Sequence, residues 1–131
     1  MINMSRAFYY CSAVTESNWV NASKWVVTNV TTLEYTFTKT NFNAAVNIWN
    51  VTNCLNYNST FALCTKFNQS LASWNVTNSQ NFDQMFYACT ALSGKSFATW
   101  SITLAKSLGH IYKMFNTIGT GNTLPTGYVV T

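Results

Sequence analysis

The chain has 131 residues, which is enough for one domain and too few for two ordinary ones. Charged residues make up only 8% of the chain and aromatic residues 16%, the reverse of the balance in disordered proteins. The net charge of +4 rests on seven Lys and Arg residues scattered singly along the sequence, which argues against a nucleic-acid-binding protein.

Hydropathy argues against a membrane protein. No apolar run approaches the roughly 20 residues that a helix needs to span a bilayer, so no membrane insertion is expected. The start, Met-Ile-Asn-Met-Ser-Arg, lacks the apolar stretch of a signal peptide. Either the chain is not secreted as written, or sequence upstream of residue 1 is missing.

The chain begins inside a repeat. Residues 2–11, Ile-Asn-Met-Ser-Arg-Ala-Phe-Tyr-Tyr-Cys, match the middle of a unit whose full form appears further along the chain. No tryptophan segment precedes them, although later units have one, and residues 12–24 are stretched relative to those units. The first unit, residues 1–29, is therefore interpreted as degenerate.

Four tryptophans mark the units in chain order. Trp25, Trp49, Trp74 and Trp100 are separated by 24, 25 and 26 residues. The first three begin the pattern Trp-x-Val-Thr-Asn, and a Phe lies twelve residues after each of them, whereas the fourth begins a worn copy, Trp-Ser-Ile-Thr-Leu. A period of this length is the signature of a repeat protein whose units stack on one another.

Each unit is predicted to contain one strand and one helix or helical turn. Residues 74–78 alternate between the two sides of an extended chain, as in a short strand. Residues 82–92 carry apolar side chains at steps of three and four, which is typical of one helix face, and Asn81 or Thr77 is the expected N-cap. The sequence thus predicts an α/β repeat solenoid, a leucine-rich-repeat-like stack of short parallel strands with a helix or helical turn per repeat.

The whole chain is predicted to form a single solenoid domain of four to five repeats, approximately residues 1–29, 30–53, 54–78, 79–104 and 105–131. The last of these is degenerate and ends in an unfinished strand at residues 128–131. Stacking would hide columns of equivalent side chains from water, and each fully buried large side chain contributes about 1.5–3 kcal/mol. The predicted core columns are Trp25, Trp49, Trp74, Trp100, Phe8, Phe37, Phe61, Phe86, Phe115, Cys11, Cys64 and Cys89.

The repeat resembles a known family. Residues 61–78 read Phe-Ala-Leu-Cys-Thr-Lys-Phe-Asn-Gln-Ser-Leu-Ala-Ser-Trp-Asn-Val-Thr-Asn, and Met85-Phe-Tyr-Ala-Cys89 follows. This motif is similar to that of the BspA-like surface leucine-rich-repeat family, over most of residues 2–115. The resemblance implies surface-displayed or adhesive proteins of bacteria and protists, with related repeats in large DNA viruses, and it brings no catalytic activity. The chain departs from the motif at Thr40, where Cys is expected, in residues 12–24 and after Trp100.

The cysteines are expected to be structural. Cys11, Cys64 and Cys89 share one repeat position among apolar residues, and Cys54 lies just past a predicted strand. The paired Cys-x-x-Cys or Cys/His sets of metal sites are absent, so no metal is expected. Free buried thiols are the favoured interpretation. A disulfide between Cys64 and Cys89 is the alternative, because stacking brings equivalent positions of adjacent repeats close together.

Ionisable residues give no sign of catalysis. The sole histidine is His110, and the only acids, Glu16, Glu34 and Asp83, belong to different repeats, at spacings that suggest no dyad or triad. Residues 119–121, Gly-Thr-Gly, lack the Lys of a phosphate-binding loop. The protein is therefore predicted not to be an enzyme and to use no cofactor.

Three sets of polar residues are candidates for other roles. A column facing inward is expected to bond turn backbone: Asn29, Asn53 and Asn78. A column facing outward on the predicted strands is either a binding surface or an ordinary solvated face: Thr28, Asn50, Thr52, Asn75, Thr77, Ser101 and Thr103. Seven asparagines begin glycosylation sequons, which the repeat alone could also explain: Asn3, Asn21, Asn29, Asn50, Asn58, Asn68 and Asn75.

Two functions follow from these observations. The first is a non-enzymatic, surface-displayed repeat protein for adhesion or for binding a host protein or glycan, at the cell surface or outside it. The second is a structural subunit of a virion or filament that packs end to end through uncapped solenoid ends. The expected partners are accordingly other copies of the chain, further repeats of a longer chain, or a host protein or glycan, and no nucleic acid.

Overall fold

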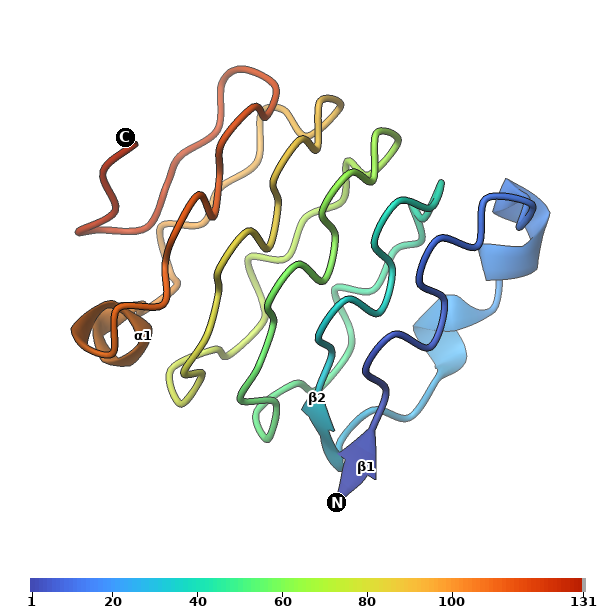
Figure 1. Ribbon diagram of the computed structural model, residues 1–131, viewed down its shortest axis with the longest axis horizontal. Helices are drawn as coiled ribbons and strands as arrows, with labels where there is room; N and C mark the ends of the chain where they lie inside the picture. The colour runs from blue at the N-terminus through green and yellow to red at the C-terminus, as the bar shows by residue number, and fades with distance from the viewer. Residues whose placement is uncertain (131) are drawn as a thin grey trace.

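In the computed structural model, which describes residues 1–130, successive stretches of the chain lie side by side across the molecule (Figure 1). The regular elements are short. Strand β1 (Ile2–Asn3) pairs in parallel with β2 (Val30–Thr32), and Ile2 lies opposite Val30. Two 3₁₀ helices, η1 (Glu16–Trp19) and η2 (Ala22–Lys24), lie between these strands in the sequence, and one α-helix, α1 (Thr103–Ser107), follows much later.

The predicted α/β repeat solenoid, with a strand and a helix or helical turn in every repeat, is wrong. Within residues 1–130, β1 and β2 are the only strands and α1 is the only α-helix. Residues 74–78 are irregular and end in a turn, and residues 82–92 are dominated by turns. No strand includes residues 128–130, and Thr131, the last residue of the predicted terminal strand, lies outside the described residues.

Left-handed backbone conformations explain why no helix forms in residues 82–92. Gln84 and Ala88 have φ values of 54° and 59°, whereas a right-handed helix requires about −60°. The chain instead makes consecutive turns, in which Met85 N–H donates to the Phe82 carbonyl at 3.1 Å. Turns of this kind bring every third or fourth side chain to the same face, so their apolar spacing resembles that of a helix.

Two residues with left-handed backbone conformation, four positions apart, recur in five equivalent stretches. We call these stretches the ladder segments: residues 4–11, 33–40, 57–64, 82–89 and 111–118. Alternate N–H groups of each segment donate to carbonyls of the next. For example, Phe61 N–H donates to the Met85 carbonyl at 2.9 Å, and Leu63 N–H to the Tyr87 carbonyl at 2.7 Å. Four such bonds join each neighbouring pair of segments. These bonds pair many of the backbone N–H and carbonyl groups, although almost no regular strand is present.

Aromatic rings form two rows beneath the ladder segments. The phenylalanine row has centroid distances of 5.8, 5.7, 5.7 and 5.3 Å, and its planes lie within 13° of parallel: Phe8, Phe37, Phe61, Phe86 and Phe115. The tryptophan row is spaced at 6.0, 6.1 and 6.4 Å: Trp25, Trp49, Trp74 and Trp100. The indole N–H of Trp74 donates to the Val46 carbonyl at 2.9 Å, so this buried polar group has a partner.

The two ends of these rows differ. Phe8 and Trp25, at the end near β1, are half-buried, whereas Phe61 and Phe86 in the middle are fully buried. At the other end, the ring of Tyr128 packs edge-on against Phe115 at 5.1 Å. The first end of the aromatic core is therefore open, and the second is covered.

Candidate binding surfaces

The ionisable residues form one contact that the sequence did not suggest. His110 Nδ1 lies 3.0 Å from an oxygen of Asp83, and the other oxygen of Asp83 accepts the Tyr112 N–H at 2.7 Å. Glu34 instead accepts from the Ser5 hydroxyl at 3.3 Å, on a different part of the surface. The Asp83–His110 pair thus ties the fourth ladder segment to the residue just before the fifth. Among the described residues, no group of three or more His, Cys, Asp or Glu could hold a metal.

All four cysteines carry free thiols. Cys64 and Cys89 lie in the core, and their S–H groups each donate to a phenylalanine carbonyl of the preceding ladder segment at 2.9 Å. Burial raises the pKa of Cys54 to about 11 and that of Cys64 to about 12, and it raises the pKa of Cys89 well above its ordinary value. Cys11, at the open end of the core, is only half-buried.

We expect one thiol of the folded protein to react quickly with Ellman's reagent at pH 8, and all four to react in denaturant. The thiolate is the reactive form. With a raised pKa of about 11, roughly one Cys54 thiol in a thousand is ionised at pH 8, and burial also blocks access of the reagent. In the variant Cys11→Ser, the fast phase should disappear. Rapid reaction of two or more thiols in the native state would contradict this assignment.

The outward column was predicted on strands, but none of its residues lies in one: Thr28, Thr52 and Thr77 are in turns, Thr103 begins α1, and Asn50, Asn75 and Ser101 are irregular. Asn50 and Asn75 are exposed, and each side-chain oxygen accepts the N–H of the residue two positions later, Thr52 or Thr77, at 3.2 Å. Thr28, Ser101 and Thr103 are also exposed. These residues therefore lie on the molecular surface, and the side-chain oxygens of Asn50 and Asn75 also shape the local backbone.

The predicted inward column of asparagines is wrong in its direction, because Asn29, Asn53 and Asn78 are all exposed. The side chain of Asn53 does bond backbone, donating to the Thr28 carbonyl at 2.8 Å. The position that reaches the core comes one residue later, where Cys54 is buried. A turn at each of these asparagines redirects the chain, so strand alternation does not apply.

A different pair of asparagines has the bonding role that we expected of this column. Asn43 Oδ1 accepts the Asn68 N–H at 2.9 Å, and Asn68 Oδ1 accepts the Ser93 N–H at 3.1 Å. Each side chain thus bonds the backbone of the next repeat. Of the sequon asparagines, Asn58 and Asn68 are partly buried, whereas the remaining five are exposed: Asn3, Asn21, Asn29, Asn50 and Asn75.

The sequence reasoning missed a surface group of aromatic and basic residues, all exposed except the partly buried Tyr35, which we call the tyrosine–cation cluster: Arg6, Tyr9, Tyr10, Tyr35 and Lys39. The Tyr9 and Tyr10 rings are 4.3 Å apart, and Tyr9 meets Tyr35 edge-on at 5.7 Å. Arg6 lies over Tyr35 at 5.1 Å, and Lys39 lies over Tyr10 at 4.9 Å. Arg6, Tyr10, Tyr35 and Lys39 occupy the left-handed positions of the first two ladder segments.

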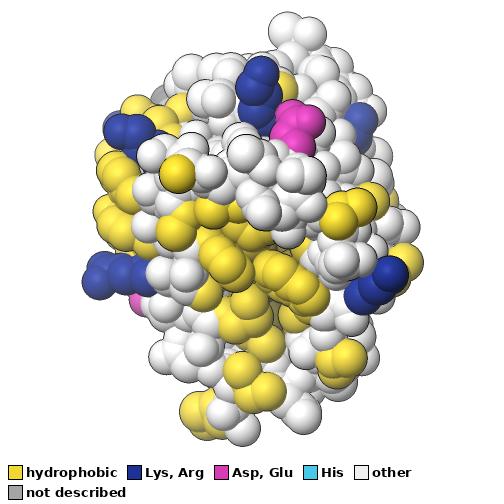
Figure 2. All heavy atoms as spheres, turned by 90° about the vertical axis from the view of Figure 1, so that its right-hand side faces the viewer, with side chains coloured by type: hydrophobic (Ala, Val, Ile, Leu, Met, Phe, Trp, Pro, Cys, Tyr) yellow, Lys and Arg dark blue, Asp and Glu magenta, His cyan; other side chains and the backbone are white. Residues whose placement is uncertain are grey.

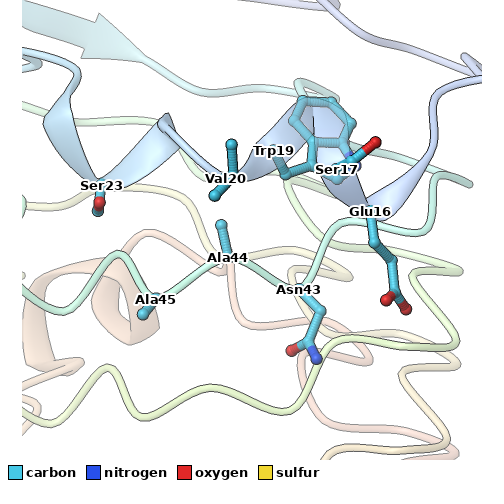
Figure 3. A pocket seen from close by; sticks show the side chains of 8 residues that line it. All are labelled: Glu16, Ser17, Trp19, Val20, Ser23, Asn43, Ala44 and Ala45. Atoms are coloured by element: carbon cyan, nitrogen blue, oxygen red, sulfur yellow. The ribbon is translucent and has the colours of Figure 1, made fainter.

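A hollow of about 410 Å³ lies between the 3₁₀ helices and residues 43–45 (Figure 3). Val20 and Ala44 point toward each other across it, and Glu16 and Asn43 hang at its side (Figure 3). Trp19, in the wall, is buried and donates its indole N–H to Asn41 Oδ1 at 2.9 Å. This hollow offers one carboxylate, the polar side chains of two serines and an asparagine, and apolar side chains.

Comparison with known proteins identifies the family. Residues 2–125 match the family described as Mycoplasma protein of unknown function, DUF285. The chain belongs to this family. DUF285 is related to the BspA-like repeats that the sequence resembles. No curated protein and no solved structure matches the chain.

The DUF285 match includes every ladder segment and the whole tyrosine–cation cluster. It also includes both aromatic rows, whereas Tyr128, which covers the end of the phenylalanine row, lies just beyond it. The family description gives no activity. Within residues 1–130, no helix is long and apolar enough to cross a membrane.

Proposed function

We propose that this DUF285 protein is a non-enzymatic binding module, displayed at a cell surface, that mediates adhesion by contacting a protein or a glycan. The relation of the family to the BspA-like surface repeats supports this setting. The observation that carries the proposal is the tyrosine–cation cluster. It concentrates exposed Tyr and Arg, two of the residue types most enriched where proteins bind one another.

The cluster has the properties of a binding surface because its rings are exposed and yet held in place. Tyr9 and Tyr10 retain 41% and 47% of their exposed area, although both are bonded through the backbone to neighbouring residues. A tyrosine ring has few rotatable bonds, so fixing it on binding costs little conformational entropy. Arg6 and Lys39, which lie over these rings, place positive charge at the edge of the cluster.

The experiment compares the wild-type protein with the double variant Tyr9→Ala/Tyr10→Ala in binding to host cells, immobilised host-surface proteins and glycan arrays. We expect the variant to lose at least tenfold in affinity, which corresponds to about 1.4 kcal/mol. The matched control is Tyr112→Ala, which removes an exposed tyrosine from the fifth ladder segment and should leave binding unchanged. If the wild-type protein binds none of these surfaces, or if the two variants weaken binding equally, the proposal fails.

A structural subunit of a virion or filament that packs end to end is the alternative function. The open end beside Phe8 favours it, because a neighbouring copy could cover that end. The other end counts against it, since Tyr128 already lies on Phe115 and accepts its N–H at 3.2 Å. The binding module is therefore the better supported proposal. Spontaneous filaments of the wild-type protein at low micromolar concentration would reverse this preference.

A further inference from the structure

The open end of the molecule carries a row of backbone carbonyls without partners. In the four later ladder segments, alternate carbonyls accept N–H groups of the preceding segment, as Thr36 accepts from Phe8 at 2.9 Å. The equivalent carbonyls of the first segment belong to Asn3, Ser5, Ala7 and Tyr9, and no donor among residues 1–130 reaches them. This edge is therefore an array of hydrogen-bond acceptors, and their spacing matches that of the N–H donors along a ladder segment.

An apolar hollow lies beside this edge. Figure 2 views the molecule from that end and shows apolar side chains gathered in the middle of the face, within a largely polar surround. The hollow measures about 610 Å³, and its lining includes Phe8, Val14, Trp19 and Trp25. Phe8 stacks on Phe37 on its inner side. The outer face of the Phe8 ring, which is only partly buried, is therefore equivalent to the ring face on which a neighbouring phenylalanine stacks inside the row.

The opposite end has the complementary groups. The N–H groups of Ile111, Lys113 and Thr117 would donate to a following segment, and none of them reaches an acceptor among residues 1–130. The equivalent N–H of Phe115 donates to the Tyr128 hydroxyl, and the Tyr128 ring covers Phe115 edge-on. Among the described residues, the ring of Tyr128 therefore lies against the last ring of the phenylalanine row and occupies one of the N–H donors beside it.

We propose that the end beside Phe8 is a docking surface for the last ladder segment of a second copy, and that Tyr128 competes for that segment and holds association back. The contact repeats the interface that joins ladder segments four times within the chain. Phe115 of one copy stacks on Phe8 of the next, and N–H donors meet the free carbonyls. This proposal does not depend on the tyrosine–cation cluster or on its binding function.

Hydrogen-bond polarity selects the orientation. Two open ends facing each other would bring acceptors against acceptors and bury unpaired carbonyls, which is costly. The head-to-tail arrangement pairs donors with acceptors and is heterologous, so it extends from copy to copy. In this register Lys113 lies next to Arg6 of the following copy, because both occupy the first left-handed position of their segments. Since like charges repel and salt screens them, association should strengthen as ionic strength rises.

The test compares variants of the 131-residue chain by light scattering and sedimentation velocity. Tyr128→Ser opens the second end, and Val14→Arg places a charge in the hollow at the first end. Tyr128→Ser should form species whose mass grows with concentration. The wild-type protein and the double variant Tyr128→Ser/Val14→Arg should each be monomeric alone, because each has one usable end. Mixed together, they should form a dimer of one copy each and nothing larger.

Two outcomes would overturn the proposal. Folded Tyr128→Ser that stays monomeric excludes docking at the second end. Self-association of the double variant alone indicates contact between like ends. The matched control Val26→Arg adds the same charge at a side chain that is 85% exposed and outside the hollow, and it should not block association.

If Tyr128→Ser fails to fold, Tyr128→Phe keeps the ring and frees the Phe115 N–H, and it should associate more strongly than wild type. Equal masses for these two proteins would then refute the proposal.

Discussion

Replacing Phe61 with alanine should lower the free energy of unfolding by about 3–5 kcal/mol, the usual cost of removing a buried aromatic ring. Phe61 is fully buried at the centre of the phenylalanine row. Its ring stacks on Phe37 and Phe86 at 5.7 Å and on Phe67 at 4.3 Å. Neighbouring rings are themselves fixed by the backbone ladder, so they cannot collapse into the cavity. Urea unfolding followed by tryptophan fluorescence measures the change.

The matched control is Val26→Ala, which truncates a side chain that is 85% exposed. It should change stability by less than about 0.5 kcal/mol, as surface substitutions generally do. A loss of less than about 1.5 kcal/mol for Phe61→Ala would show that the row relaxes around the missing ring. That result would contradict the description of the core as a close-packed stack.

Replacing Ala88 with proline should destabilise the protein by about 3 kcal/mol or more, through the backbone alone. Ala88 has φ of 59°, whereas the proline ring fixes φ near −65°. The Ala88 N–H also donates to the Asn116 carbonyl at 2.9 Å, and proline has no N–H to donate. The fourth and fifth ladder segments would separate locally. Thermal unfolding by circular dichroism, with urea titration, measures the loss.

Glycine at the same position separates backbone conformation from side-chain loss. Ala88→Gly keeps the N–H and adopts positive φ without steric cost, which offsets its larger entropy in the unfolded chain. Its stability should stay within about 1 kcal/mol of the wild-type protein. If proline and glycine had equal effects, the left-handed conformation would not be what the position requires.

The spacing of aromatic residues is enough to predict which rings lie together. Trp49 and Trp74 share a five-residue motif at a fixed distance along the chain, and stacking identical units brings identical side chains into contact. Secondary structure was not predictable in the same way. Turns with positive φ at Gln84 and Ala88 give the apolar spacing of a helix, and neither residue is of the type that favours the left-handed region.

The candidate surfaces were still harder to predict. The tyrosine–cation cluster joins residues of two ladder segments, such as Tyr9 and Tyr35, which fall at different positions of the repeat. Reading columns of equivalent residues cannot find such a group. The role of Asn43 and Asn68 was missed for the opposite reason, because their matching positions were visible in the sequence but their bonds to the next repeat were not.

The one-way direction of the ladder bonds gives the molecule an electrical polarity. Every backbone–backbone hydrogen bond between ladder segments runs from an N–H on the side of the first segment to a carbonyl on the side of the last. The peptide units between them, such as that joining Met85 to Phe86, point the same way, and each carries a dipole of about 3.5 D. Their moments add along the molecule, negative where the chain begins and positive at the opposite face. Cations are thus favoured near the first segment, where Arg6 lies.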